Sequence, residues 1–363
     1  MNERILVGCD LHDKTMMLMI AVGAGLPVKR VIRNTVEGRK AMIADLLSRA
    51  QAAKAEIFFT YEASALGFGL FDELTAAGVK CFVLAPSKIE RSPRDRRNKT
   101  DENDATRLLE IVRAHVLAGN KIPAVAVPSK IVRDDREIVR ARLDAQDKSG
   151  SIKTQIRTLL KRHGVEKPKD MNGPWTIKYR GWIHNLSICN ASLPEGAQAH
   201  LASLLRQLKC VEDEVAMLNK QIEVLSATPR YTNEVRALLV LGGVGLLTAM
   251  VFLTEVGDLN RFKNRRKFGS FLGIVPSAYD SGERIRKGHI THQGPDRVRF
   301  VLCQAAWNRI RVDKVERKIY DGIATKNPNR KKIALVAIMR RLAIRMWHTA
   351  MNTRLGVQNQ RPA

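Results

Sequence analysis

The sequence predicts a mixed fold, in which an α/β domain is followed by two mainly helical regions. Three features indicate this. Over roughly the first third, short apolar runs alternate with stretches of helical periodicity. One heptad pattern continues without a break near the middle of the chain. Helices are expected over much of the last third. We place the three expected domains at residues 1–125, 126–230 and 231–352.

The first region reads as three strands followed by a helix, a strand, a helix and a strand. Strands are expected at short apolar runs, and helices where apolar residues recur at helical spacing. The elements are expected at Ile5–Val7, Met16–Val22, Val28–Ile32, Val36–Ala50, Ile57–Tyr61, Leu66–Ala77 and Val79–Leu84. This order is the one expected of an RNase H-like α/β fold.

A long helix of mixed charge is predicted over Ser129–His163, and a second helix carries the clearest periodicity of the chain. Apolar residues alternately three and four apart form a heptad seam: Leu201, Leu204, Leu208, Val211, Val215, Leu218, Ile222 and Leu225. The seam predicts a coiled coil, either with Ser129–His163 or with another subunit. The alternative is a single helix that lies on its own domain. Between the two helices we expect a loop that carries Trp175 and Trp182.

The last region begins near Asn233. Its stretch Ala237–Leu253 lacks charges but is short for a membrane span, so we expect buried core. Leu241–Thr248 is either a helix–hairpin–helix turn that offers backbone N–H groups to phosphate or a plain connection. A Gly/Ser-rich loop is expected next, and then two helices: Gly269–Gly294, Arg297–Arg311 and Arg330–Met351.

The charge of the chain indicates a nucleic-acid partner. Its 363 residues include 62 Lys and Arg against 36 Asp and Glu, so the formal net charge is +26 and the pI is near 10.3. Such a charge opposes compaction unless a polyanion neutralises it, and the 45% of hydrophobic residues excludes a disordered basic tail. The five scattered cysteines favour reduced thiols and exclude a zinc ribbon. Because no signal peptide is found, we expect a cytoplasmic protein with no membrane partner.

Four acidic residues stand where an RNase H-like fold places metal ligands. Asp10 ends the first strand and Glu62 ends the fourth, while Asp101 and Asp104 share one face at the start of a helix. Carboxylates suit Mg²⁺, which would stabilise the attacking and leaving oxygens of a phosphoryl transfer. Each residue also has an ordinary alternative, because a helix cap, a first-turn charge or a solvated strand end would explain it.

A serine in the last region belongs to a second candidate site. Ser281 lies among small residues and precedes three cations that would offset phosphorane charge if the serine attacked DNA: Arg284, Arg286 and Lys287. Ser277 is the competing nucleophile, and a hydroxyl that only contacts phosphate is the alternative for this loop. Other basic residues are expected to bind nucleic acid: Arg96, Arg97, Lys99, Arg265, Arg266 and Lys267.

Motifs along nearly the whole chain resemble those of the DEDD transposases of bacterial insertion sequences (the insertion sequence 110 family), which include Piv-type DNA invertases. They are Gly8–His12, Tyr61–Ser64, Lys99–Ala105, Gly242–Thr248, Glu255–Asp258 with Arg261-Phe262, and Gly273–Pro276 leading to Ser281-Gly282. Two departures occur: Glu62-Ala63-Ser64-Ala65 replaces the usual Glu-Ala-Thr-Gly, and Cys9 replaces an aliphatic residue. Both leave the catalytic set complete.

The resemblance implies a RuvC-like N-terminal domain whose four metal-binding acidic residues match Asp10, Glu62, Asp101 and Asp104. It also implies a coiled-coil middle and a C-terminal transposase domain whose catalytic serine matches Ser281. Such a protein is a site-specific, Mg²⁺-dependent DNA recombinase that forms a serine–DNA covalent intermediate. A bacterial, nucleoid-associated homodimer or tetramer is expected, with a structured noncoding RNA as its guide to donor and target DNA. Two alternatives stay open: a RuvC-like nuclease that uses water, and a scaffold that binds nucleic acid without catalysis.

Overall fold

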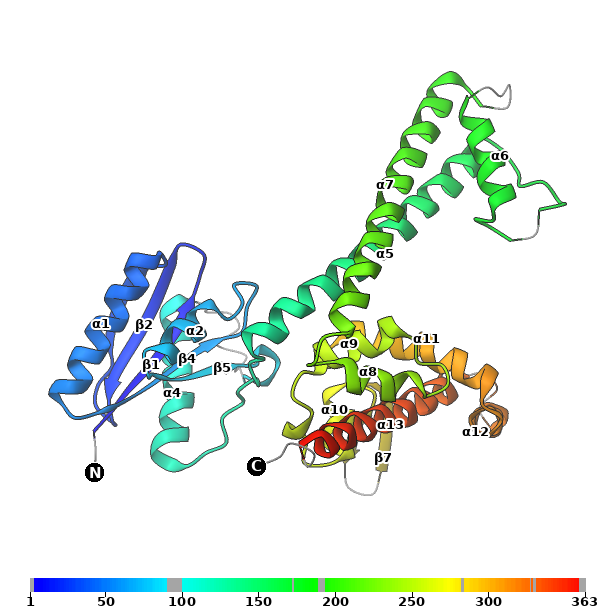
Figure 1. Ribbon diagram of the computed structural model, residues 1–363. Helices are drawn as coiled ribbons and strands as arrows, with labels where there is room; N and C mark the ends of the chain where they lie inside the picture. The colour runs from blue at the N-terminus through cyan, green and yellow to red at the C-terminus, as the bar shows by residue number, and fades with distance from the viewer. Residues whose placement is uncertain are drawn as a thin grey trace. The chain divides into compact units, whose positions relative to one another are not determined.

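The computed structural model describes residues 3–89, 100–171, 173–188, 193–281, 284–326, 328 and 331–358, with the backbone alone for 278–281, 284–287 and 355–358. The chain divides into two compact units, Met1–Val127 and Pro128–Ala363 (Figure 1). Each unit has its own hydrophobic core, and the two are described separately.

A five-stranded mixed sheet forms the centre of the first unit (Figure 1). The strands are β1 (Arg4–Leu11), β2 (Thr15–Val22), β3 (Val28–Arg33), β4 (Glu56–Glu62) and β5 (Lys80–Leu84). Their order is β3-β2-β1-β4-β5, in which β2 is antiparallel to both neighbours and β1, β4 and β5 are parallel. All five occur where short apolar runs were found, so the predicted α/β character of the first region is confirmed.

Helices cover both faces of this sheet. On one face Ile5, Val7 and Cys9 belong to a core with residues of α1 (Val36–Ala52) and α2 (Gly69–Ala76). On the opposite face Leu6 packs with residues of α4 (Asp101–Ala118), and a short 3-10 helix, η1 (Pro86–Lys88), follows β5. Because side chains alternate along a strand, the even-numbered residues of β1 face α4.

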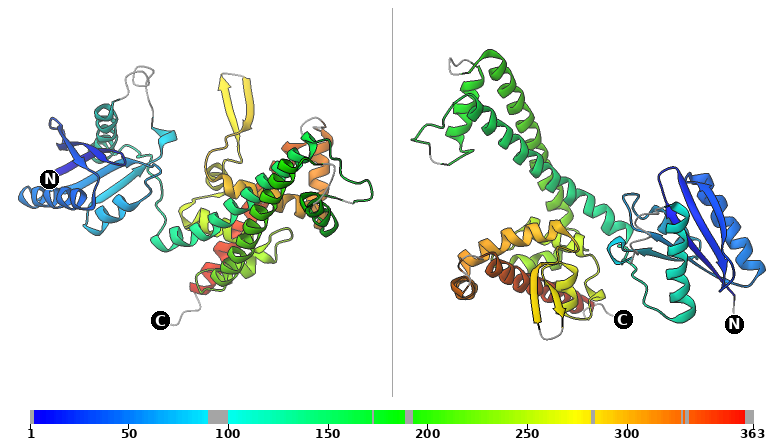
Figure 2. Two further views of the ribbon diagram at one scale, coloured as in Figure 1. Left: turned by 90° about the horizontal axis from the view of Figure 1, so that it is seen from above. Right: turned by 180° about the vertical axis from the view of Figure 1, so that it is seen from behind.

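The second unit begins with a long helical hairpin. Its two helices, α5 (Lys130–Arg162) and α7 (Glu195–Ser226), lie side by side in every view (Figures 1 and 2). Most of the predicted seam of α7 is buried, with Val211 and Val215 half-buried at its middle: Leu201, Leu204, Leu208, Leu218, Ile222 and Leu225. Leu204 and Leu208 share a core with Ile156 of α5, so the helix expected over Ser129–His163 covers the seam within one chain.

Two segments expected to be loops contain regular structure. Helix α6 (Ile177–Ile188) carries Trp182 and lies between the two long helices in the sequence. Its three buried residues have helical spacing, but the segment is short and follows a Gly-Pro pair, which masked the pattern. Strands β6 (Pro276–Ser281) and β7 (Arg284–Ile290) pair inside the expected Gly/Ser-rich loop, because a hairpin needs only short strands around turn residues.

Helices make up the rest of the second unit. They are α8 (Thr232–Leu239), α9 (Leu246–Val256), η2 (Leu259–Arg261), α10 (Arg265–Phe271), α11 (Asp296–Val312), α12 (Lys314–Lys326) and α13 (Lys332–Gln358). Helix α9 is buried from Ala249 to its end, so the uncharged stretch Ala237–Leu253 contributes to the core, as predicted. Among the described residues, no helix combines the length and apolar character that crossing a membrane requires.

Buried ion pairs join α5 to the helices that follow the hairpin. Glu255, at the end of α9 and 8% exposed, accepts two hydrogen bonds from Arg140, at 2.7 and 3.0 Å. Asp135 is 2% exposed and accepts hydrogen bonds from Arg230 and from the hydroxyl of Tyr231, the latter at 2.8 Å. A buried carboxylate that lost such partners would be strongly destabilising, so these pairs fix α5 to the C-terminal core.

The seam predicts a contrast between two positions on α7. Leu208→Ala should lower the free energy of unfolding by about 2–5 kcal/mol, because it leaves a cavity where a side chain is 2% exposed. Val224→Ala, on the same helix but 73% exposed, should change it by less than about 0.5 kcal/mol. Urea unfolding followed by tryptophan fluorescence measures both, because all four tryptophans lie in the second unit. Equal effects would contradict the packing of α7 on α5.

Candidate active site

Two of the four acidic residues lie at the ends of neighbouring strands on one face of the sheet: Asp10 is the last residue but one of β1, and Glu62 is the last of β4. Strands β1 and β4 are parallel, and Cys9 lies opposite Tyr61, so Asp10 and Glu62 follow as the next residues. Cys9 and Tyr61 both point into the core under α1 and α2, which places Asp10 and Glu62 on the α4 side. Neighbouring strands lie about 4.8 Å apart, so the two carboxylate-bearing residues are adjacent in the sheet.

The other two acidic residues begin α4. Thr100 caps this helix, and its side chain accepts a hydrogen bond from the backbone N–H of Asn103. Asp101 is exposed, whereas Asp104, one turn later on the same face, is 9% exposed. The Oδ1 atom of Asp104 lies 3.7 Å from a guanidinium nitrogen of Arg107. The positive end of the helix macrodipole favours carboxylates in this first turn.

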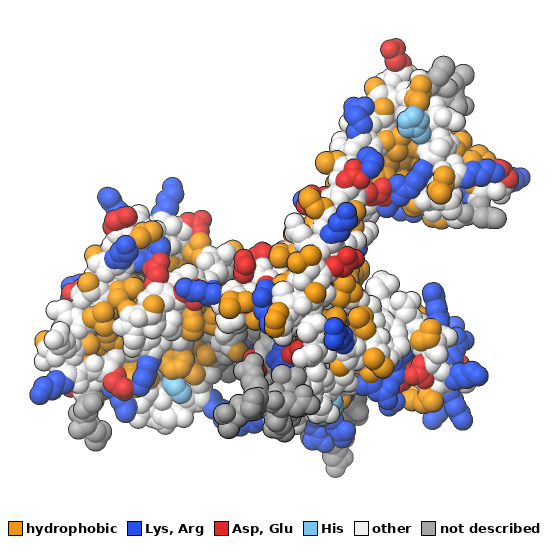
Figure 3. Space-filling view, in the orientation of Figure 1, with side chains coloured by type: hydrophobic (Ala, Val, Ile, Leu, Met, Phe, Trp, Pro, Cys, Tyr) orange, Lys and Arg blue, Asp and Glu red, His pale blue; other side chains and the backbone are white. Residues whose placement is uncertain are grey.

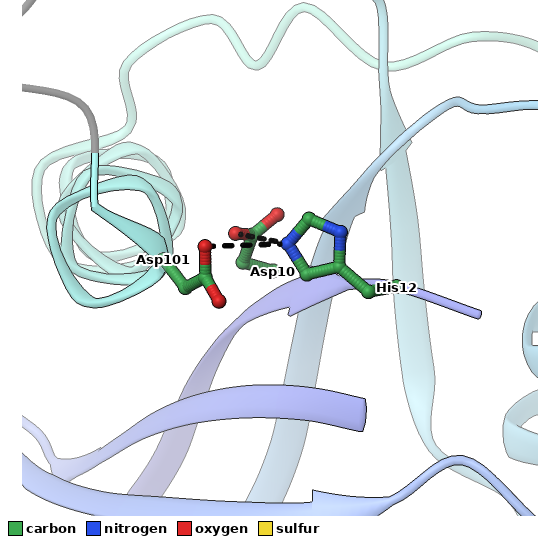
Figure 4. Close-up of side chains that lie close together, drawn as sticks. All are labelled: Asp10, His12 and Asp101. Atoms are coloured by element: carbon green, nitrogen blue, oxygen red, sulfur yellow. Dashed lines mark hydrogen bonds and ion pairs between the residues drawn. The ribbon is translucent and has the colours of Figure 1, made fainter. Parts of the chain in front are cut away.

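His12 connects the strand to the helix. Its Nε2 atom lies 3.0 Å from Oδ2 of Asp10 and 3.4 Å from Oδ1 of Asp101 (Figure 4). One possible ligand atom from each of these three residues lies within 4.8 Å of the other two. Among the described residues, this is the group of acidic and histidine side chains close enough to share a metal ion.

The charges of this acidic cluster (Asp10, Asp101, Asp104, with Glu62 beside Asp10) oppose one another. Burial raises the pKa of Asp10, and the nearby carboxylates of Asp104 and Asp101 raise it further, while His12 lowers it. The short distances from His12 to Asp10 and Asp101 place the first turn of α4 next to β1. Carboxylate oxygens are hard ligands suited to Mg²⁺, so the donor set fits this ion, and the His12 nitrogen would also suit Mn²⁺.

The serine candidates lie on a β-hairpin of the second unit. Ser281 is the last residue of β6 and pairs with Arg284, the first residue of β7, at the end of the hairpin farther from its base. The left view of Figure 2 shows this hairpin projecting from the helices of its unit. Ser277 lies near the base, where its hydroxyl donates a hydrogen bond to the backbone carbonyl of His289 at 3.1 Å.

The predicted basic contacts are divided between described and undescribed parts of the chain. Arg265, Arg266 and Lys267 form the exposed first turn of α10, and the Asn264 side chain accepts hydrogen bonds from two of its backbone N–H groups. The backbone of Arg284, Arg286 and Lys287 belongs to β7. Three further predictions lie outside the described residues: Arg96, Arg97 and Lys99.

The turn between α8 and α9 packs against another helix. Gly243 has a φ of 89°, and a Cβ there would lie 2.6 Å from the carbonyl oxygen of Ala305 in α11. The preceding residue, Gly242, accepts a hydrogen bond from the Arg309 guanidinium at 3.0 Å. Close packing against α11 therefore explains the glycine at position 243.

Comparison with known proteins places the chain in a family. Residues 7–164 match the family model of DEDD transposases of IS110 elements, and residues 235–321 match the model of the IS116/IS110/IS902 transposase family. The chain is similar to the putative transposase y4qE of Sinorhizobium fredii (strain NBRC 101917 / NGR234), with 32% identity over 286 residues, 78% of this chain and 67% of the relative. It is also similar to the transposase for insertion sequence element IS1533 of Leptospira borgpetersenii, with 25% identity over 315 residues, 85% of this chain and 86% of the relative. The chain belongs to the IS116/IS110/IS902 transposase family.

The resemblance seen in the motifs is thereby confirmed, and the protein is a transposase of IS110-family insertion sequences. Within this transposase the structure brings Asp10, His12 and Asp101 together, with Asp104 one helical turn after Asp101 and Glu62 at the end of the adjacent strand. Sequence reasoning missed His12 as a member of the cluster. Its spacing of two from Asp10 was the available signal, because residues i and i+2 of an extended chain lie on the same side.

Gly8 makes the geometry of the transposase site possible. A Cβ on Gly8 would lie 2.2 Å from the carbonyl oxygen of Ala105 and 2.3 Å from the backbone nitrogen of Leu109, both in α4. Gly8→Ala therefore forces α4 away from β1, which should cost about 1–3 kcal/mol of stability and weaken divalent-metal binding. Gly69→Ala is the matched control, because a Cβ at that position meets open space.

Calorimetric titration with Mn²⁺, together with thermal unfolding followed by circular dichroism, tests this prediction. We expect weaker metal binding in the Gly8→Ala variant and wild-type binding in the control. Wild-type affinity and stability in Gly8→Ala would show that the position of α4 does not matter for the cluster.

Proposed function

We propose that this transposase cuts and rejoins DNA at a metal site formed by Asp10, Glu62, Asp101 and Asp104, and that Ser281 is its covalent nucleophile. The convergence of Asp10 and Asp101, from a strand and a helix far apart in the sequence, carries the proposal, and Asp104 follows Asp101 by one helical turn. A cluster of carboxylates whose charges repel is costly to maintain, and a bound cation relieves that cost.

The acidic cluster would hold one or two Mg²⁺ ions. Bound there, the metal supplies charge stabilisation to the scissile phosphate and favours the deprotonated form of the nucleophile. Within the chain, β1 and β4 orient Asp10 and Glu62, and Thr100 fixes the first turn of α4 from which Asp101 and Asp104 project. These rigid supports suit residues that must keep their relative positions during the reaction.

The serine step exchanges one phosphodiester for another. The Oγ of Ser281 attacks phosphorus, the bond from phosphorus to the leaving sugar oxygen breaks, and that oxygen takes up a proton. Because an ester to serine replaces the broken one, rejoining needs no external energy source. The serine proton needs an acceptor, and the carboxylates nearest to Ser281 in the sequence are Asp280 and Glu283, so we propose that Ser281 reacts on the phosphodiester held by the acidic cluster.

Three finer features belong to this proposal. The strand order and the helices on both faces support an RNase H-like, RuvC-like fold for residues 1–125. The heptad seam between α5 and α7 supports a coiled coil within residues 126–230, which precedes a serine-bearing domain over residues 231–352. The net charge of +26 supports binding of both DNA and a structured guide RNA, and joining two DNA partners requires a homodimer or tetramer.

If the acidic residues bind the metal, a substitution among them should abolish DNA cleavage without weakening DNA binding. Asp104→Asn should lower DNA strand cleavage by at least about 100-fold, because metal affinity depends on such ligands. DNA affinity should stay the same or increase, since one negative charge is removed. Glu110→Gln, an exposed site on the same helix that pairs with Arg113, is the control and should keep activity. Normal recombination by Asp104→Asn in a gel assay with Mg²⁺ would exclude the four-carboxylate site.

The nucleophile predicts a covalent product that distinguishes the two serines. Wild-type protein should form a protein–DNA adduct that mass spectrometry locates on Ser281. Ser281→Ala should bind DNA with unchanged affinity and yield no adduct, whereas Ser277→Ala should retain the adduct because its hydroxyl donates to the His289 carbonyl. An adduct lost only in Ser277→Ala would move the nucleophile four residues upstream. Free 3′-hydroxyl and 5′-phosphate ends without any adduct would favour the water-using nuclease.

A further inference from the structure

The far end of the helical hairpin contains a cavity that neither catalytic candidate uses. Its volume is about 440 Å³, within the range typical of sites for small ligands. It lies between the C-terminal end of α5, the segment that follows it and α6. The residues that matter for its chemistry are Arg157, Lys161, Lys167, Pro174, Tyr179 and Trp182.

One wall of the cavity is aromatic. Tyr179 and Trp182 of α6 line the cavity, and Trp175, which precedes the helix, packs against Tyr179, with ring centroids 5.4 Å apart in both successive pairs. Tyr179 is 4% exposed in the middle of this row, whereas Trp182 is half-buried and lines the cavity. Figure 3 shows apolar side chains at this end of the hairpin, with Lys and Arg side chains at their edges.

A partly exposed group of ion pairs holds this wall in place. Arg180 of α6 donates two hydrogen bonds to Glu212 of α7, at 2.6 and 2.8 Å, and Lys153 of α5 contacts the same carboxylate at 2.9 Å. These partners hold the pKa of Glu212 at about 2, so the group stays charged at neutral pH. Lys153 and Arg180 also lie over the ring of Trp175, at 5.5 and 5.9 Å from its centroid. Two cations therefore already contact the ring of Trp175.

The rim of the cavity is positive. Arg157 and Lys161 are exposed, one turn apart on α5, and Glu166 is the one acidic residue in the lining. The ammonium of Lys167 donates a hydrogen bond to the carbonyl of Met171, which ties down the segment between α5 and α6. An apolar, aromatic interior below exposed cations matches a planar, apolar group attached to a phosphate.

We propose that this cavity binds an unpaired nucleotide of single-stranded nucleic acid, with the base stacked on Trp182 and the phosphate near Arg157 and Lys161. Aromatic stacking accepts any base, and neighbouring cations hold the backbone, which is how many proteins bind single strands. A duplex keeps its bases stacked inside and presents only phosphates to such a site. The cavity therefore favours unpaired over paired nucleic acid, and the net charge of the chain favours a polyanion over a second copy of the protein.

The inference rests on the proposed handling of nucleic acid, but it is tested by binding alone. Full-length protein without divalent metal is titrated into fluorescein-labelled oligonucleotides: single-stranded DNA, single-stranded RNA, and a DNA duplex of equal length. Salt of roughly 0.3 M weakens the contribution of phosphate contacts. Trp182→Leu should weaken single-strand binding about 5- to 150-fold, because it keeps an apolar side chain but removes the stacking surface.

Matched variants separate stacking from folding. Trp182→Tyr should retain most single-strand affinity, and Trp307→Leu, at an exposed tryptophan of α11, should bind like the wild type. Lys161→Gln should reduce the slope of log affinity against log salt by about 0.7 for a single strand. Duplex affinity should change less than about twofold in Trp182→Leu. The DNA and RNA arms show which strand is the better ligand, and a selective loss in either supports the proposal.

Three results would overturn it. One is unchanged single-strand affinity in Trp182→Leu, and another is an equal loss for single strands and duplex, which would indicate a general phosphate surface. The third is a change in oligomeric state of Trp182→Leu without nucleic acid, measured by light scattering, which would assign the cavity to a second copy of the chain. Because none of these measurements involves cleavage or an adduct, such a failure leaves the proposed catalytic site intact.

Discussion

The arrangement of the acidic residues depends on one close approach, between the backbone of β1 at Gly8 and the backbone of α4. Because Gly8 has no side chain, the carbonyl oxygen of Ala105 occupies space within 2.2 Å of where a Cβ would be. Helix α4 therefore packs directly on β1, near the end of which Asp10 lies. Its first turn then brings Asp101 and Asp104 to that strand end, about ninety residues away in the sequence. A larger residue at position 8 would push α4 away from β1, and would therefore separate Asp101 from Asp10.

This close approach concentrates negative charge, and the surrounding structure limits its cost. Burial and the two carboxylates of α4 raise the pKa of Asp10, so the ionised cluster is less stable than isolated carboxylates would be. The positive end of α4 and the His12 ring partly offset this repulsion. In a chain with a net charge of +26, such a local concentration of acid is best explained by a cation that binds there. The same carboxylates repel phosphate when no cation is present, which favours a reaction that depends on metal.

The sequence predicted the elements of the first unit well and the connections of the second unit poorly. The sequence located all five strands: four are apolar runs, and β3 has Val28, Val31 and Ile32 among basic residues. Asp10 and Glu62 were predicted to end strands, and their adjacency follows from the parallel pairing of β1 with β4. His12 was missed because its spacing of two from Asp10 places it on the same side of the chain but does not show that Asp101 is also near. Hairpin β6–β7 was missed because glycine and polar residues obscure the alternation of short strands.

The serine hairpin is anchored at its base and supported by little else among the described residues. Gly273 and Gly294 approach neighbouring backbone so closely that a Cβ would lie 2.0 Å from the Gln293 carbonyl oxygen and 1.8 Å from that of Phe271. Towards Ser281, strands β6 and β7 pair only with each other in the described sheet topology. A two-stranded hairpin in isolation is only marginally stable in water. The fold thus fixes where the hairpin begins, and the backbone pairing of β6 with β7 extends from there to Ser281. If Ser281 is the nucleophile, as proposed, bound DNA would add to the support that this two-stranded hairpin receives from its base.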